Sequence, residues 1–370
     1  MLVHAEKIAI QKGALGCLTL RRPEALNALS AEMFQQMRVA LEAWEKDPDV
    51  KAVILDSSSD RAFCAGGDVK NVVLKAREED LDFAQEFFVA EYSMDYDLHC
   101  YPKPILCWAQ GITMGGGIGL MNGCSHRVAT EASLFAMPEI SIGFFPDVGG
   151  GYFLNRLPDG VGLFLGLTGA RFRGGDAVAL GMADSLIKHE DKQQVVDRLS
   201  QTDWSEAGVE NFAKMSEALE SFRLHEIQSD LALPLTELGR RLSGFSTLEQ
   251  VDEFLRHQEI SHEALESARI EYVDGSPLVA RVIYEHIGRC RNLSLAQVFA
   301  VEWSLAIRFC SEPEFQEGVR ALLIDKDKRP EWRFSSLKDV PKKEWEYLMA
   351  PVEPNLLSPH LAQRSPRTSL

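Results

Sequence analysis

The chain has 370 residues, of which 45% are hydrophobic and 25% are charged, and its formal net charge is −16 at pH 7. This length exceeds one average domain, so we expect a compact core with a second unit. A non-specific nucleic-acid binder needs a basic face, so no nucleic-acid partner is expected. An anionic small ligand is still compatible with the charge, because local donors can outweigh the overall field.

The seven cysteines are scattered and form neither a CxxC pair nor a zinc-like spacing. An odd, scattered set indicates reduced thiols, so the cytoplasm is the predicted location and no metal is expected. The first twenty residues lack the basic and apolar regions of a signal peptide. Since no apolar run approaches the roughly 18 residues of a membrane span, no membrane partner is expected.

The first part of the chain alternates between predicted strands and helices. Residues 6–11 and 16–20 are expected to pair as strands about a glycine turn. Ser30 is a suitable N-cap for a helix over 31–46, whose apolar residues share one face. A short buried strand is predicted over 52–56. This order of strand, helix and strand favours a layered α/β core.

The same alternation continues to about residue 190. A polar loop is predicted over 57–68. Further strands are predicted over 104–109, 127–129 and 134–136, and helices over 81–99, 149–157 and 161–167.

Beyond residue 190 the chain is acidic and amphipathic, without strand-like alternation. The predicted helices there cover 191–200, 205–222, 246–258, 261–271, 277–290, 295–310 and 318–324. We therefore divide the chain into a core over 1–190, a helical region over 191–350 and a proline- and serine-rich tail over 351–370.

A glycine cluster follows the predicted strand at 104–109, with the sequence Gly-Ile-Thr-Met-Gly-Gly-Gly-Ile-Gly over 111–119. Glycines let a ligand approach the backbone, and the first N–H groups of a helix lack internal partners. Such donors bind an anion or a developing oxyanion. A second loop, 65–67, could supply another N–H to the same oxygen. Either loop alone is equally compatible with a simple tight turn.

A dinucleotide-binding site is the competing interpretation of the glycine cluster. Gly117, Gly119 and Gly123 spell GxGxxxG, which differs from the GxGxxG fingerprint, although Glu131 follows. The helix would also span only about seven residues before the strand at Arg127, which is short for a dinucleotide-binding unit. Both differences disfavour this alternative.

Several long motifs resemble the crotonase (enoyl-CoA hydratase/isomerase) superfamily in order and spacing. They are Arg-Pro-Glu-Ala-Leu-Asn-Ala-Leu at 22–29, Ala-Phe-Cys-Ala-Gly-Gly-Asp at 62–68 and the glycine cluster. The resemblance covers about residues 4–190 and resumes in the C-terminal helices. Within the superfamily, residues 135–153 are similar to the 3-hydroxyisobutyryl-CoA hydrolases. The resemblance implies a crotonase-like α/β fold of repeated ββα units in a spiral, with a C-terminal helical region.

The resemblance also implies an oxyanion hole and a binding region for coenzyme A. The backbone N–H groups of Gly67 and Gly116 match the oxyanion hole that polarises the thioester carbonyl. The positions that match the coenzyme A region are Leu26, Ala65, Asp68 and Val69. Coenzyme A would arrive as part of an acyl-CoA substrate, so no separate cofactor is expected.

The acids of the motifs separate the possible reactions. Glu139 matches the second catalytic glutamate of hydratases, whereas Gly119 stands where their first glutamate would be. The hydrolases keep Glu139 and add Asp147 and Glu91, which are all present. Without the resemblance, Glu139 could cap a turn, and Asp147 could accept hydrogen bonds from the amides of 149–151. Glu91 could position other groups instead of reacting.

These matches predict hydrolysis of 3-hydroxyisobutyryl-CoA to free coenzyme A and a 3-hydroxy acid, as in valine breakdown. The analogue 3-hydroxypropionyl-CoA could fit as well. The alternatives are an enoyl-CoA hydratase or isomerase and a non-catalytic acyl-CoA-binding protein. A homo-oligomer is possible, and the acidic segment of about 200–270 could cover the site or replace subunit contacts.

Overall fold

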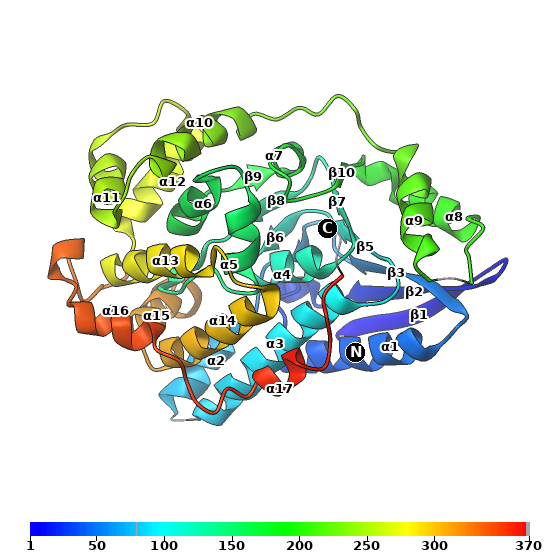
Figure 1. Ribbon diagram of the computed structural model, residues 1–370, viewed down its shortest axis with the longest axis horizontal. Coiled ribbons are helices and arrows are strands. Elements are labelled where there is room, and N and C mark those ends of the chain that lie inside the picture. The colour runs from blue at the N-terminus through cyan, green and yellow to red at the C-terminus, as the bar shows by residue number, and fades with distance from the viewer. Residues whose placement is uncertain (79, 207, 368–370) are drawn as a thin grey trace.

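The computed structural model describes residues 1–78, 80–206 and 208–367 and contains two β-sheets flanked by helices (Figure 1). The larger sheet has the order β1 (Val3–Ile10), β2 (Gly13–Leu20), β3 (Val50–Ser57), β5 (Ile105–Ala109), β7 (His126–Ala129), β10 (Ser185–Leu186). The smaller sheet has the order β4 (Ala62–Cys64), β6 (Ile112–Met114), β8 (Leu134–Ala136), β9 (Phe172–Arg173). Strand β1 is antiparallel to β2 and β8 to β9, and the other pairs are parallel.

The strands enter the two sheets in turn, which confirms the predicted ββα repeat. Strands β3, β5 and β7 join the larger sheet, and the strand after each joins the smaller one. The helices of this half are α1 (Ala31–Lys46), α2 (Val69–Arg77), α3 (Leu81–Cys100), α4 (Gly116–Gly123), α5 (Gly150–Phe153), α6 (Val161–Thr168) and α7 (Gly174–Ala179). Ser30 caps α1 as predicted, since its side chain accepts a hydrogen bond from Met33 N.

Both faces of the larger sheet are buried. Val53 and Leu55 of β3 point into the main hydrophobic cluster, whereas Ala52 and Ile54 point into a second cluster. Successive side chains alternate between faces, so a strand buried on both sides shows an unbroken apolar run. The second cluster is closed by α8 (Lys192–Ser200) and α9 (Glu210–Glu220). The first part of the acidic region therefore covers a sheet face.

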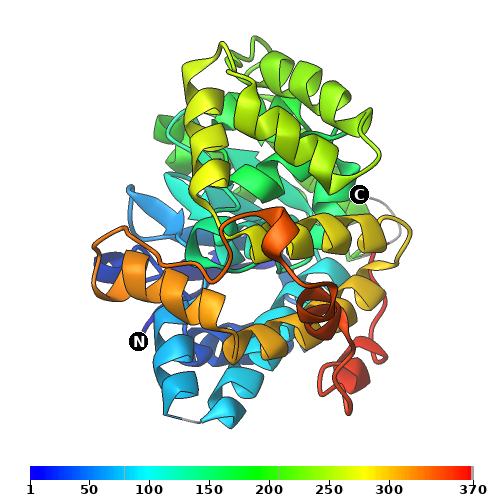
Figure 2. The ribbon, with the colours of Figure 1, turned by 90° about the vertical axis from the view of Figure 1, so that its left-hand side faces the viewer.

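The remaining helices form the C-terminal half. They are α10 (Ala232–Ser243), α11 (Leu248–His257), α12 (Glu263–Asp274), α13 (Pro277–Cys290), α14 (Leu295–Cys310), α15 (Pro313–Val319), α16 (Lys342–Met349) and α17 (Ser358–Leu361). Helices α10 and α12 pack on α6, and α14 packs on α3 (Figure 2). Helices α13 and α14 share the main hydrophobic cluster with the sheets, while the division at about residue 190 stays a prediction. None of the described helices is long and apolar enough to cross a bilayer.

Some elements differ from the sequence-based expectations. Strands β4, β6, β9 and β10 have two or three residues each, too few to show alternation. Helix α10 contains Pro234 in its first turn, where proline is tolerated, and was not expected. The helix expected at 205–222 begins at Glu210, and the one at 149–157 divides into α5 and a 3₁₀ turn over Leu154–Arg156.

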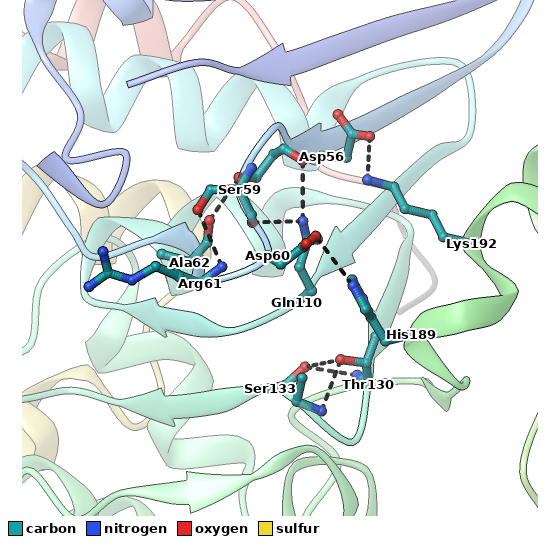
Figure 3. A network of polar contacts seen from close by, with 12 residues as sticks. Asp56, Ser59, Asp60, Arg61, Ala62, Gln110, Thr130, Ser133, His189 and Lys192 are labelled. Carbon is teal, nitrogen blue, oxygen red and sulfur yellow. Dashed lines mark hydrogen bonds and ion pairs between the residues drawn. The ribbon is translucent and has the colours of Figure 1, made fainter. Parts of the chain in front are cut away.

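The loop between β3 and β4 is held by the side chains of Gln110, which follows β5, and of Ser57, the last residue of β3 (Figure 3). Gln110 Nε2 donates to the carbonyls of Ser57 and Ser59 at 3.2 and 3.1 Å. The Ser57 hydroxyl in turn donates to the Ala62 carbonyl at 2.7 Å. These bonds fix the path of β4, which leads directly into the glycines of 66–67.

The C-terminal segment is anchored on α3, beside which α17 lies (Figure 1). The guanidinium group of Arg367 donates to the carbonyls of Leu98 and Tyr101 at the end of α3. It also donates to the carbonyl of Gly123 at the end of α4. A cation at these positions satisfies carbonyls that have no partner within their helices. Residues 351–367, predicted as a tail, therefore support the two helices that carry the glycine cluster and Glu91.

We expect Arg367→Ala to lower the free energy of unfolding by about 2–3 kcal/mol, because charge-assisted bonds to buried carbonyls are lost. Urea unfolding monitored by circular dichroism measures this change. Arg21→Ala is the control, since Arg21 is exposed. Equal unfolding free energies for the two variants would contradict a clamping role.

Candidate active site

The two glycine loops face each other between β4 and α4. A Cβ atom on Gly116 would lie 3.2 Å from the Gly67 nitrogen, and one on Gly66 would lie 3.8 Å from the Gly116 nitrogen. Among the described residues, no atom accepts a hydrogen bond from the Gly67 or Gly116 N–H. The structure therefore brings together the two residues predicted as an oxyanion hole, with both donors available.

Two carboxyl groups lie against this pair of loops. Glu91, in the middle of α3, places Oε1 2.6 Å from the Cβ position of Gly116 and 3.1 Å from that of Gly67. Glu139, the first residue of a 3₁₀ turn, places Oε1 2.9 Å from the Cβ position of Gly115. A side chain at these positions would collide with the acids. The acids therefore require glycine at these positions.

Asp147 completes the predicted set of acids. Glu91, Glu139 and Asp147 are 2%, 5% and 6% exposed, so all three are buried. Asp147 accepts a hydrogen bond from the hydroxyl of Tyr92, which follows Glu91 on α3, at 2.7 Å. Oε2 of Glu139 is buried and has no hydrogen-bond partner among the described residues.

Burial of several like charges changes the protonation of these acids. Burial raises the pKa of Glu91 well above its usual range, and Asp147 and Glu139 raise it further. Burial and then Asp147 do the same to the pKa of Glu139. For Asp147, burial raises the pKa to about 7, although the Tyr92 hydroxyl opposes the shift. The three acids cannot all be ionised together, so the site holds exchangeable protons near neutral pH.

Glu302 of α14 is a site residue that the sequence analysis missed. The amides of Gly149 and Gly151 donate to Glu302 at 2.7 and 2.9 Å, so they are not the partners of Asp147 that one interpretation assigned to them. Glu302 is fully buried and lies 3.2 Å from His286 Nε2. An acid within an apolar face of the helix at 295–310 was the available signal, since buried charges need partners.

The structure also explains the glycine at position 119. A Cβ atom there would lie 2.7 Å from Val148 Cβ and 2.8 Å from Asp95 Oδ2. Asp95 is fully buried, and neither of its carboxyl oxygens has a hydrogen-bond partner among the described residues. Burial, followed by the charge of Glu91, raises its pKa well above the usual range. A glutamate at position 119 has no room, because another carboxyl and a valine already fill that space.

The residues matched to the coenzyme A region lie together at the rim of the oxyanion hole. The Ala65 amide donates to the Leu26 carbonyl at 3.0 Å, and Leu26 adopts a left-handed conformation with φ 50°. Asp68 accepts a hydrogen bond from Arg22 at 2.9 Å, and Val69 begins α2. The half-buried Arg22 adds a cation to this surface that the sequence analysis did not select.

The raised pKa of Asp147 predicts a pH-dependent cost in stability. Between pH 4 and 7 the folded state keeps a proton that the unfolded chain releases, so stability falls as the pH rises. The difference is at most about 4 kcal/mol for a pKa of about 7 against about 3.9. Asp147→Asn still offers an oxygen to Tyr92 but does not titrate. The unfolding free energy of this variant minus that of the wild type should therefore increase from pH 5 to pH 8. Urea unfolding at both pH values tests this, and an equal difference at the two pH values would contradict it.

The curated proteins most similar to this chain include several called 3-hydroxyisobutyryl-CoA hydrolase, mitochondrial. The rat protein is 38% identical over 344 residues, covering 91% of this chain and 86% of its own length. The zebrafish protein is 37% identical over 329 residues, which cover 89% of this chain and 85% of the zebrafish protein. The human protein is 36% identical over 344 residues, which cover 92% of this chain and 87% of the human protein.

Two solved structures are also similar over almost the whole chain. An enoyl-CoA hydratase from Rhodobacter sphaeroides has a TM-score of 0.83 and 32% identity, covering 96% of this chain and 99% of its own. A carnitinyl-CoA dehydratase from Mycobacterium thermoresistibile has the same score and identity, covering 96% and 98%. The names of these two proteins describe reactions other than hydrolysis, so the fold alone does not select the reaction. The profile of the enoyl-CoA hydratase/isomerase family matches residues 15–349, and the chain belongs to this family, the crotonases.

Proposed function

We propose that the chain hydrolyses the thioester of 3-hydroxyisobutyryl-CoA. Water is consumed, the bond between the acyl carbon and sulfur breaks, and a 3-hydroxy acid and the thiol of coenzyme A are released. The observation that carries this proposal is the position of Glu91 and Glu139 against two facing glycine N–H donors, with Asp147 beside them and no room for an acid at position 119. The hydrolases similar to this chain support the same substrate.

In the proposed mechanism the thioester oxygen lies between the N–H groups of Gly67 and Gly116. Negative charge that develops on this oxygen is stabilised by both donors. Glu91 Oε1 lies against the Cβ positions of both glycines, close enough that an ionised carboxylate would oppose the oxyanion. Burial and the neighbouring acids raise the pKa of Glu91 well above its usual range, which favours the protonated form, and the O–H of that form can donate a third hydrogen bond.

Glu139 is the group proposed to act on the acyl carbon. Its carboxyl group lies beside the N-terminus of α4, which favours the reactive anion, although burial and Asp147 raise its pKa. It either attacks the carbonyl and forms a mixed anhydride, or removes a proton from the attacking water. A single turnover in ¹⁸O-labelled water tests the first route. Label within the Glu139 carboxyl group indicates an anhydride that water opens at the glutamyl carbon, whereas label only in the product acid is expected both from general-base catalysis and from an anhydride opened at the acyl carbon.

Asp147 is proposed to hold the substrate's 3-hydroxyl group or to deliver the proton that the leaving thiolate requires. A pKa of about 7 lets this acid both donate and accept a proton near neutral pH. Its bond to Tyr92 leaves its other carboxyl oxygen for the substrate. Leu26, Ala65, Asp68 and Val69 are proposed to contact the coenzyme A part.

A panel of thioesters tests the proposed function. We expect free thiol from 3-hydroxyisobutyryl-CoA, and also from 3-hydroxypropionyl-CoA if the acyl pocket tolerates loss of the methyl group. Crotonyl-CoA tests for a hydratase, the alternative suggested by the solved hydratase of the same fold. Addition of water to crotonyl-CoA without thiol release would favour that alternative. Binding without either reaction would indicate a non-catalytic protein.

We also propose that the reaction needs neither a metal nor a cofactor beyond the coenzyme A of the substrate, and that it belongs to valine breakdown. The cytoplasmic location stays a proposal, since the hydrolases similar to this chain are called mitochondrial. Imaging of the tagged full-length protein in its own cells decides between the two locations. Light scattering after size exclusion tests the possible homo-oligomer.

A further inference from the structure

A carboxylate from the C-terminal half holds the loop that carries Asp147. Glu302 accepts hydrogen bonds from the amides of Gly149 and Gly151, one with each carboxyl oxygen. Asp147 lies just before these glycines, and its backbone carbonyl accepts from Gly150 N at 2.7 Å. The loop between the acid and α5 is therefore fixed on both sides of Gly150 by a side chain of α14.

This loop has a conformation that needs external support. Val148 has φ 54° and Gly149 has φ 83°, so two consecutive residues are left-handed. Valine is branched at Cβ and rarely adopts this conformation, which persists only where the surrounding structure imposes it. The two bonds to Glu302 begin at the residue that follows Val148. They are the contacts best placed to impose the turn, and the turn directs Asp147 towards Tyr92 and the other acids.

His286 of α13 holds Glu302 from the opposite side. Its Nε2 lies 3.2 Å from Glu302 Oε1, both side chains are fully buried, and its ring packs edge-on against Phe145. Burial lowers the pKa of His286, but Cys290 and Glu302 raise it to about 10. The imidazolium that results donates to Glu302 Oε1 and so holds the carboxyl group that accepts the two amide N–H groups.

The order Cys290, His286 and Glu302 resembles a nucleophilic triad, since the cysteine Sγ lies 3.5 Å from the second histidine nitrogen. The fully buried sulfur does not support that role. A Cβ atom on Gly151 would lie 2.7 Å from this sulfur, so the same glycine loop closes over it. The three side chains face the loop and not a space for substrate, which indicates a positioning role.

We propose that Glu302, held by His286, is the positioning residue that sets the geometry of Asp147 during thioester hydrolysis. The inference rests on the proposed function and extends it, because α13 and α14 would then complete the active site from outside the glycine-rich core. The charged and titratable groups that face Asp147 are Glu91, Tyr92 and Asp95 from α3, Glu139 from the 3₁₀ turn, His286 from α13 and Glu302 from α14.

Glu302→Gln tests this inference. Glutamine has the same size, but its NH₂ group cannot accept the second amide N–H, and its charge is lost. We expect kcat to fall up to about 100-fold through misplacement of Asp147, with KM changed less than threefold. Glu302 raises the pKa of Asp147, so the pH limb of kcat that reports Asp147 should also move to lower pH. Loss of the charge moves this limb by itself, so the fall in kcat with KM little changed is the sign that Asp147 is misplaced.

Asp176→Asn is the matched control. Asp176 is 2% exposed and, like Glu302, accepts hydrogen bonds from two backbone amides, those of Arg173 and Leu231. It lies on α7, and its hydrogen-bond partners among the described residues, Arg173, Ser229 and Leu231, do not belong to the site. We expect Asp176→Asn to lower the melting temperature and to leave kcat per folded molecule and its pH profile unchanged.

Three further results decide the matter. Wild-type kcat and an unmoved pH limb in folded Glu302→Gln would overturn the inference. If Glu302→Gln does not fold, Glu302→Asp replaces it. This variant keeps the charge, so we expect a lower kcat with the pH limb of the wild type. An unchanged kcat in Glu302→Asp would overturn the inference. If the wild type releases no thiol, the proposed function fails, but ¹³C NMR titration of the Asp147 carboxyl still tests the positioning. An identical Asp147 pKa in the wild type and Glu302→Gln would overturn it.

Discussion

Replacing Glu139 by glutamine is expected to reduce thioester hydrolysis about 1,000-fold or more, because a base or nucleophile at the acyl carbon is lost. The change preserves the size of the side chain and removes one of the buried like charges, so the fold should tolerate it. Coenzyme A affinity should stay within about twofold, since the matched coenzyme A residues are at the rim of the oxyanion hole. Thiol release measures the rate, and calorimetry with coenzyme A measures the affinity.

Glu190→Gln is the control for Glu139→Gln. Glu190 is exposed and forms a surface ion pair with Lys188. Removal of its charge should leave the rate unchanged. A Glu139→Gln variant that retains its full rate would overturn the assignment of Glu139. Equal losses of rate and coenzyme A affinity would instead indicate a role in binding.

The predicted site residues of contiguous motifs lie side by side in the structure. The loops containing Gly67 and Gly116 meet in space because each follows a short strand of the same sheet, so the order of the motifs also predicts their proximity. Glu91, Glu139 and Asp147 lie within or just before such motifs. The glycines appear in the sequence as clusters, whereas the acids that would touch their Cβ positions come from other segments of the chain.

The supporting residues could not be predicted in the same way. Glu302 bonds to Gly149 across 153 residues of sequence, and the carboxyl of Asp95 lies against the Cβ position of Gly119 from another helix. These contacts depend on how α3 and α14 pack, which periodicity alone does not determine. Strands β4, β6, β9 and β10 escaped prediction for a related reason, since their pairing partners, and not their own patterns, make them strands.

Gly116→Ala is the sharpest test of the oxyanion hole. Alanine suits a helix start such as that of α4, so local propensity favours the substitution. The new methyl group would nevertheless lie 2.6 Å from Glu91 Oε1 and 3.2 Å from the Gly67 nitrogen. Either Glu91 moves or the two donors separate, and both changes weaken contacts to the developing oxyanion. We expect kcat to fall about 100- to 1,000-fold, in the range seen when one oxyanion donor is lost.

Gly288→Ala provides the matched comparison, because Gly288 lies in helix α13 and a Cβ atom there would meet nothing within 4 Å. That variant should keep the wild-type kcat and gain up to about 1 kcal/mol of stability, as glycine in a helix interior is unfavourable. Thiol release and urea unfolding measured on both variants separate catalysis from folding. Gly116→Ala with wild-type kcat would show that the carbonyl oxygen does not lie between these loops, whereas a loss of rate confined to Gly116→Ala is the result that a shared oxyanion hole requires.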